Sequence, residues 1–170
     1  MKHWFMAGSH RQDYELGVDE SVMYNGKRSG YIKPIVAQPG GFGTLMQKCK
    51  ADTYRNKRLR FTAAVRTADV TGWVGLWMRV DGPRRNETLA FDNMKHRPIT
   101  GTTDWQQYEV VLDVSQEADV IAFGMILHGS GTAWISNIGF EEVDDAVLVT
   151  SVQASRTYPD EPSNLDFSEV

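Results

Sequence analysis

One segment, residues 73–82, alternates two kinds of side chain with the period of a β-strand. Aliphatic side chains take every second position, at Val74, Leu76, Met78 and Val80. The positions between them are Trp73, Gly75, Trp77 and Arg79. Because successive side chains leave opposite faces of a strand, one face belongs to an apolar core, whereas the other carries indole rings and a guanidinium group. The segment therefore predicts a sheet with one buried face and one candidate binding surface.

The same alternation recurs along most of the chain, and turn-forming residues divide the chain into short pieces. The turns include Asn25-Gly26, Pro39-Gly40-Gly41, Asp81-Gly82-Pro83 and Gly129-Ser130-Gly131. The strands predicted from this pattern are residues 3–7, 14–18, 30–36, 44–50, 57–67, 73–81, 87–93, 105–114, 119–128 and 132–142. Residues 44–52 could instead form one short helix, because Leu45, Met46 and Cys49 fit either period.

Many short strands, turns rich in Gly and Pro, and almost no helical periodicity predict an all-β fold, a two-sheet antiparallel jelly-roll sandwich of about ten strands over residues 1–145. The side chains expected in its interior are Leu59, Phe61, Val65, Leu76, Met78, Val80, Leu112, Phe123 and Met125. From Asp144 onward Ser, Thr, Pro, Asp and Glu prevail. Residues 146–170 are therefore predicted to form an acidic C-terminal tail that is partly disordered.

Composition and charge exclude several classes of partner. A formal net charge of −4 lacks the basic excess that dominates affinity for nucleic acids. Basic residues between Arg55 and Arg66 and at Arg84-Arg85 are interpreted as a solvated face and as protection of strand edges. No apolar run approaches the ~20 residues of a membrane-spanning helix, so no membrane partner is expected. The single Cys49 and the absence of a signal-peptide pattern favour a cytoplasmic location.

Three stretches carry a resemblance to a known class of domain. They are residues 57–63 followed by 72–82, residues 105–110 with the sequence Trp-Gln-Gln-Tyr-Glu-Val, and residues 131–141. Over roughly residues 3–143 this order of elements resembles the jelly roll of carbohydrate-binding modules, the galactose-binding-like sandwich. The resemblance implies a β-sandwich with a binding role, but folds of this shape serve many ligands.

A narrower resemblance concerns residues 75–82, 91–94 and 97–99. These blocks resemble those of small stand-alone bacterial proteins that are uncharacterised, some of which carry a transcription-regulator label. No helix-turn-helix pattern is readable in this chain. Any regulatory role that the resemblance implies would be that of an accessory domain.

No metal or cofactor is expected. Calcium-binding modules of this type carry a pair of aspartates in the last strand, where this chain has Ser136 and Asn137. Neither supplies a charged oxygen, and Ca²⁺ prefers sites with carboxylates. The histidines, at positions 3, 10, 96 and 128, do not show the short spacings typical of zinc ligands.

No catalytic residue is predicted either. Ser130 lacks the Gly-x-Ser-x-Gly pattern of a nucleophilic serine. A hydrolytic mechanism could pair Asp92 with Glu87 or Asp104, but nothing in the spacing selects such a pair. The sequence favours a protein that is not an enzyme.

The candidate ligand-binding residues are Trp73, Trp77, Arg79, Asp92, Asn93, Arg97 and His128. On one concave sheet they would combine aromatic area with directional hydrogen bonds, as sites for sugars and other small polar ligands do. Two alternatives stay open. A loop or residues 1–14 could cover the two tryptophans and make a second small core, and the polar residues of 91–99 could simply form turn hydrogen bonds and ion pairs.

The predicted function is therefore a non-catalytic module that recognises a small polar ligand, such as a carbohydrate, on the concave sheet. The alternative is a structural or protein-interaction domain, in which the aromatic face or the acidic tail contacts a partner protein or forms a homodimer. In that case the domain could be accessory to a regulator.

Overall fold

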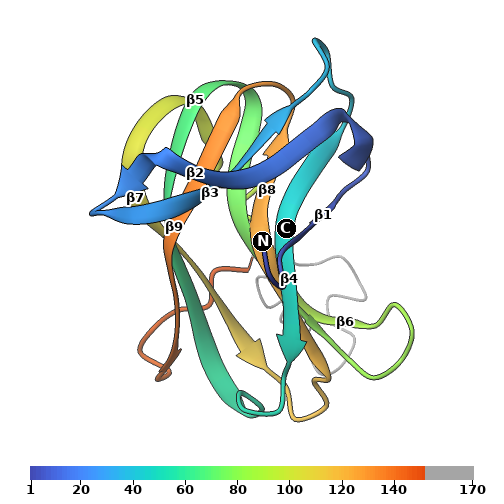
Figure 1. Cartoon of the computed structure of the whole chain (residues 1–170). Helices are drawn as coiled ribbons and strands as arrows, with labels where there is room; N and C mark the ends of the chain where they lie inside the picture. Colours follow the sequence, from blue (N-terminus) through green and yellow to red (C-terminus); the bar gives the residue numbers. More distant parts are fainter. Residues whose placement is uncertain (152–170) are drawn as a thin grey trace, which may run out of the picture.

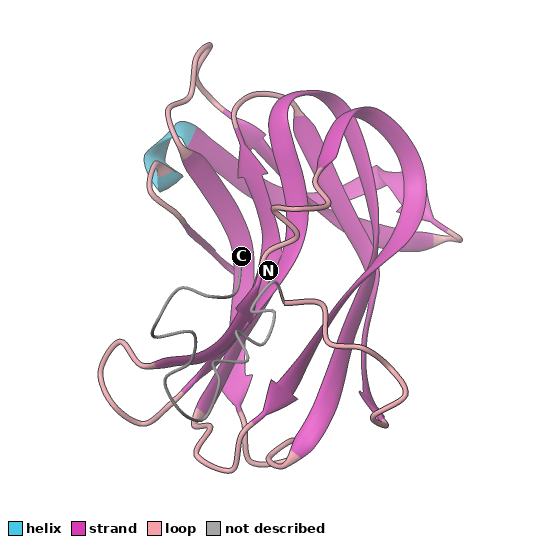
Figure 2. Cartoon of the chain, turned by 180° about the vertical axis from the view of Figure 1, so that it is seen from behind, coloured by secondary structure: helices cyan, strands magenta, loops and turns pink. Residues whose placement is uncertain are grey.

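A computed structural model describes residues 1–151, and these are almost entirely strand (Figures 1 and 2). The strands are β1 (Phe5–Ala7), β2 (Tyr14–Tyr24), β3 (Lys27–Pro34), β4 (Phe42–Lys50), β5 (Lys57–Asp81), β6 (Thr88–Asp92), β7 (Ile99–Val114), β8 (Val120–His128) and β9 (Thr132–Val143). A single 3₁₀ turn, Arg11–Asp13, is the only helical element of residues 1–151. Residues 44–50 lie in β4, so the strand prediction is confirmed over the helical alternative.

Strand β5 is 25 residues long and takes part in both layers of the fold. Its first part pairs with β7 and β9, and its later part, from Trp73 onward, pairs with β8 and β6. The register with β7 shifts repeatedly between Val65 and Val74, and Asp69 has a left-handed φ of 56°. In Figure 1 β5 arches over and descends beside β8. Two strands were predicted here. They form one because the chain reverses its direction through an arch in which strand pairing continues.

Two layers follow from these pairings, all of which are antiparallel. The first layer contains β1, β4, β8, the later part of β5, and β6. The second contains β7, the first part of β5, β9, β3 and β2. Phe61 of the second layer packs against Phe123 of the first, with ring centroids 5.4 Å apart. The protein is thus an antiparallel β-sandwich of the predicted jelly-roll type.

The apolar core lies between the two layers. All of the side chains predicted to be interior are buried, and Leu59, Phe61 and Met78 are fully excluded from solvent. Alternation along β5 accounts for this, because every second side chain of both its parts faces the same interior. Cys49, in contrast, lies on an exposed end of β4 as a free thiol.

The segment after β9 folds back onto the second layer. Arg58 Nη1 donates a hydrogen bond to the carbonyl oxygen of Val147 at 2.6 Å, and the backbone N–H of Thr150 donates to the carbonyl oxygen of Val111 at 2.9 Å. Residues 147–150, near the start of the predicted tail, thus contact the second layer through these hydrogen bonds. The rest of the predicted tail, from residue 152, lies outside the described residues. The described part of the chain contains no helix long and apolar enough to cross a membrane.

Candidate functional site

The outer face of the first layer carries a row of three aromatic rings. Trp73 of β5 is paired with His128 of β8, and His128 is paired with Phe42 of β4. The ring centroids of Trp73 and His128 are 4.5 Å apart, and those of His128 and Phe42 are 4.9 Å apart. Because β8 lies between β4 and β5, the imidazole is enclosed between the other two rings and only its edge can meet a ligand. We call these three residues the aromatic row.

Trp77 forms a fixed floor beside the aromatic row. Its indole N–H donates a hydrogen bond to Thr44 Oγ1 at 2.7 Å, and the Thr44 hydroxyl donates to the carbonyl oxygen of Met125 at 3.0 Å. The indole starts from β5 and reaches β4, so it must cross β8, where its paired residue is Gly124. A Cβ atom on Gly124 would collide with the carbonyl oxygen of Leu45, so only glycine allows the close approach of β4 and β8 under the indole. Trp77 is only 6% exposed, and its orientation is set by this bond.

A groove of about 640 Å³ lies over this floor. Its aromatic lining consists of Phe42, Trp73, Trp77 and Phe91. Its polar lining consists of Thr44, Arg79, Asn93, Lys95 and His128. Trp77 does pack with Met46 and Ile126 into a small second cluster, against which Ala7 of the N-terminal segment packs, as one alternative held, but both tryptophans still line the groove.

One wall of the groove is formed by the end of β6 and the loop that follows it. Phe91 is paired with Arg79, and beyond it the loop passes close to the backbone of β5. A Cβ atom on Gly75 would lie 2.6 Å from the carbonyl oxygen of Asn93, so only glycine allows this approach. The backbone N–H of Leu76 donates to the sulfur of the buried Met94 at 3.2 Å. These contacts hold Asn93 and Lys95 at the rim.

Arg79 is held in place at the far end of the floor from the aromatic row. Its Nε donates to Asp81 Oδ1 at 2.7 Å, and its Nη2 donates to Asp81 Oδ2 at 3.1 Å. The guanidinium carbon lies 6.0 Å from the centroid of the Trp77 ring. These two hydrogen bonds occupy one side of the guanidinium, which leaves Nη1 and the second N–H of Nη2 to donate to a ligand.

The electrostatics of the groove favour a neutral His128. Burial among the aromatic rings lowers the pKa of His128, and the positive charge of Lys95 lowers it further. At neutral pH the ring therefore carries one N–H donor and one nitrogen acceptor. The groove can offer a ligand donors of several kinds and a large apolar area.

The structure brings together most of the predicted site residues but not all of them. Trp73, Trp77, Arg79, Asn93 and His128 all line the groove. Asp92 and Arg97 lie outside it, and their predicted place on this surface is corrected. Asp92 is paired with Met78, whose side chain faces the interior, so the carboxylate also points away from the groove.

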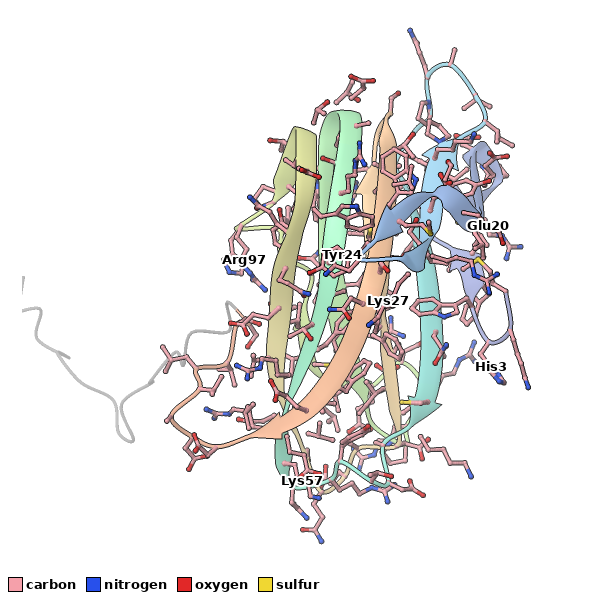
Figure 3. All side chains as sticks on the ribbon, turned by 60° about the vertical axis from the view of Figure 1, so that its left-hand side comes forward. His3, Glu20, Tyr24, Lys27, Lys57 and Arg97 are labelled. Atoms are coloured by element: carbon pink, nitrogen blue, oxygen red, sulfur yellow. The ribbon has the colours of Figure 1, made fainter. Side chains whose placement is uncertain are left out.

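Asp92 and Arg97 instead form an ion pair with each other. Arg97 Nη2 lies 2.7 Å from Asp92 Oδ2 and also donates to the carbonyl oxygen of Glu109 at 2.9 Å. Figure 3 shows Arg97 at one edge of the molecule, on the side opposite to His3. The alternative of structural ion pairs in residues 91–99 therefore describes these two residues.

Several lining residues were not predicted from the sequence, among them Phe42, Thr44, Phe91 and Lys95. Phe91 and Lys95 share the alternation of Asn93, and this signal could have placed them on the same face. Phe42 and Thr44 were harder to find, because their strand could also be read as a helix and because their neighbours in β8 are far away in the sequence.

The described residues contain no group of three or more His, Cys, Asp or Glu side chains arranged to hold a metal ion. At the position where the sequence resemblance implies a pair of aspartates in calcium-binding modules, Ser136 Oγ donates to the carbonyl oxygen of Arg28, and Asn137 Oδ1 accepts a hydrogen bond from Lys27 Nζ. Both side chains therefore form hydrogen bonds between β9 and β3.

No protein-family model matches this chain. Over 170 residues the chain is 45% identical to the "Uncharacterized HTH-type transcriptional regulator YbfP" of Bacillus subtilis (strain 168). The match covers 99% of this chain but 57% of that protein, so the chain spans little more than half the length of this relative. The described residues contain no helix-turn-helix.

Solved structures with a similar fold include carbohydrate-binding modules. The CBM22-1 xylan-binding domain of Paenibacillus barcinonensis Xyn10C is 13% identical with a TM-score of 0.56, and the match covers 84% of this chain and 86% of that one. TmCBM61 in complex with β-1,4-galactotriose is 13% identical with a TM-score of 0.55, covering 84% and 90%. At such identities the likeness shows the fold alone. The chain thus has the β-sandwich fold of carbohydrate-binding modules and is similar in sequence to a protein named as a regulator.

Proposed function

We propose that this protein is a non-catalytic binding module whose groove takes a small polar ligand of the carbohydrate class. The observation that carries the proposal is the groove on the outer face of the first layer, where Trp77 forms a fixed floor between the aromatic row and Arg79. Its volume of about 640 Å³ is in the range of small-molecule sites. The fold it shares with carbohydrate-binding modules supports the same class of ligand.

The chemistry of the lining suits a sugar. The C–H surfaces of a pyranose ring pack on aromatic side chains, and its hydroxyl groups need directional partners. Arg79 Nη1, the amide of Asn93 and the edge of His128 supply such partners around the apolar floor. Because Arg79 and Trp77 are held by bonds within the protein, little side-chain entropy is lost on binding.

The same lining argues against a hydrolytic role for the groove. None of the described residues that line it is an aspartate or a glutamate, and its one hydroxyl group, that of Thr44, is engaged with Trp77 and Met125. Glycoside hydrolysis usually requires two carboxyl groups on either side of the bond that is cleaved. Recognition without turnover is the activity that these residues support.

The test is calorimetric titration of the full chain with a panel of mono- and oligosaccharides, followed by variants of the groove. Trp73→Ala and Arg79→Ala should each weaken binding of a saccharide that binds the wild type by about tenfold or more, corresponding to about 1.4 kcal/mol. Arg66→Ala is the matched control, because Arg66 lies on the second layer with its guanidinium over Trp134. The proposal is wrong if no saccharide binds, or if both groove variants bind as tightly as the wild type.

A second candidate function is a sensor or interaction domain accessory to a transcription regulator. The similarity to a regulator-named protein of which this chain spans 57% favours it. Strand β2, at the end of the path of paired strands, also exposes Val18 and Met23, which are both 47% exposed. Light scattering tests the homodimer form of this hypothesis, and a strictly monomeric chain would exclude that form.

A further inference from the structure

We propose that the ligand of this groove carries a negatively charged oxygen group, the carboxylate of a uronic acid or the phosphate of a sugar phosphate, which Lys95 binds at the end of the groove formed by the aromatic row. The inference rests on the proposed function and narrows its ligand class. Its basis is the distribution of charge around the groove.

All charged side chains that line the groove are cationic. They are Arg79 and Lys95, and no aspartate or glutamate is among the lining residues that the structure describes. The whole chain has 22 acidic and 18 basic residues, so a lining without a carboxylate departs from its average composition. A cationic cleft attracts anions because the apolar walls screen its field less than bulk water does.

The two cations differ in how far their charge is compensated. Arg79 is paired with Asp81 through two hydrogen bonds, whereas Lys95 forms no ion pair with any residue between 1 and 151. Several basic residues of the second layer are paired, for example Arg58 with Asp113 at 2.8 Å and Lys57 with Glu142 at 2.7 Å. Among residues 1–151, Lys95 is therefore the groove's uncompensated charge, whereas the charge of Arg79 is balanced by Asp81 and its free N–H groups are left for neutral hydroxyl groups.

The fold fixes the end of the groove at which this charge lies. The backbone N–H of Lys95 donates to Asn93 Oδ1 at 3.1 Å, in the loop that passes close to Gly75. The charge of Lys95 also acts on His128, in the middle of the aromatic row. An anionic group near Lys95 would thus lie beside the aromatic row, where the sugar ring that carries it can pack.

A second hollow, of about 600 Å³, adjoins the groove at Arg79 but does not select an anion. Its cationic side chains are Lys48, Arg79, Arg84 and Arg85, and its acidic side chains are Asp81, Glu87 and Asp119. An anion there would meet carboxylates as well as cations, whereas no carboxylate lines the groove in the part of the chain that the structure describes. The anionic group is therefore assigned to the Lys95 end of the groove.

The experiment compares matched neutral and charged sugars on the full chain by calorimetry. Galactose is compared with galacturonic acid and with galactose 6-phosphate, and xylo-oligosaccharides are compared with the same chains bearing glucuronic acid. At least one charged sugar should bind about tenfold more tightly than its neutral counterpart, and added salt should reduce this preference. The arm that shows the preference distinguishes a carboxylate from a phosphate.

Two variants test whether Lys95 causes the preference for the charged sugar. Lys95→Met should bring the ratio of the charged to the neutral affinity close to one, while Lys50→Met, which removes the same charge from an exposed position on β4 outside the groove, should leave the ratio as in the wild type. Unchanged thermal unfolding establishes that both variants are folded.

The outcomes separate this inference from the proposed function. If neutral and charged sugars bind equally well, or if Lys95→Met keeps the preference, the inference is overturned while the binding module stands. If no sugar of either kind binds, the proposed function fails and the inference fails with it.

Discussion

His128 shows how neighbouring residues set the chemistry of a single side chain. Its ring lies between Phe42 and Trp73, and Lys95 contributes a positive charge from the loop after β6. Burial disfavours the protonated ring first, and the lysine adds to this effect, so the pKa of His128 lies below its usual value of 6.5. The folded state therefore loses stability as the pH falls from 6.5 through this lowered pKa, because the unfolded chain binds the proton more readily than the folded protein does.

We expect Lys95→Met to raise the pKa of His128 but not to restore it to 6.5, because burial remains. An NMR titration of the histidine ring signals measures this directly. Lys50→Met serves as the control and should leave the titration unchanged. A pKa of His128 at or above 6.5 in the wild type would contradict the burial of its ring, and a pKa that does not respond to Lys95→Met would contradict the described position of Lys95.

Asp92 connects three elements of the fold at a buried position. It is 4% exposed and accepts hydrogen bonds from Arg97 Nη2 at 2.7 Å, from the Thr150 hydroxyl at 2.6 Å and from the backbone N–H of Met94 at 3.1 Å. Burial alone would raise the pKa of Asp92, but these donors together outweigh it and hold the pKa below 3.8. The carboxylate thereby joins β6, the loop of the groove wall and the segment after β9.

Thr150→Val removes the hydroxyl group while keeping the shape of the side chain. At neutral pH it should lower the free energy of unfolding by about 1.5–3 kcal/mol, the usual contribution of a hydrogen bond to a charged group. The difference from the wild type should shrink as the pH falls below 3.8 through the lowered pKa of Asp92, because the protonated group no longer needs the donor.

Chemical denaturation at pH 7 and at pH 3 provides the measurement for this variant. Thr88→Val is the matched control, because Thr88 lies at the exposed start of β6. A loss of stability that is equal at the two pH values would show that Thr150 acts through packing or through its hydrogen bond with the backbone N–H of Val111, and not through the carboxylate of Asp92.

The sequence predicted those features that depend on interactions between residues close together in the chain, and missed those that depend on distant residues. Alternation along the chain placed Trp77 and Arg79 on one face and Leu76 and Met78 on the other, because that signal is local. It could not place Asp92, whose orientation depends on its register with Met78 and on a partner 58 residues away. For the same reason the continuity of β5 was missed, since its bend depends on pairing with two different layers.

At the scale of the whole molecule, the outer faces of the two layers differ in whether their basic side chains are paired with carboxylates. The second layer pairs several of its arginines with carboxylates, as at Arg58 with Asp113 and Arg60 with Glu141. The first layer exposes a groove with an apolar floor and cationic rim. A net charge of −4 for the chain does not reveal this division, because it arises from which strands become neighbours.

The central claim is that the groove of the first layer is where this protein binds its ligand. The most direct test follows the indole N–H signals of the five tryptophans by NMR while the full chain is titrated with a saccharide that binds in calorimetry. The account predicts that the signals of Trp73 and Trp77 shift, and that those of Trp105 and Trp134, which belong to the second layer, do not. Shifts at Trp105 or Trp134 with Trp73 and Trp77 unmoved would contradict it.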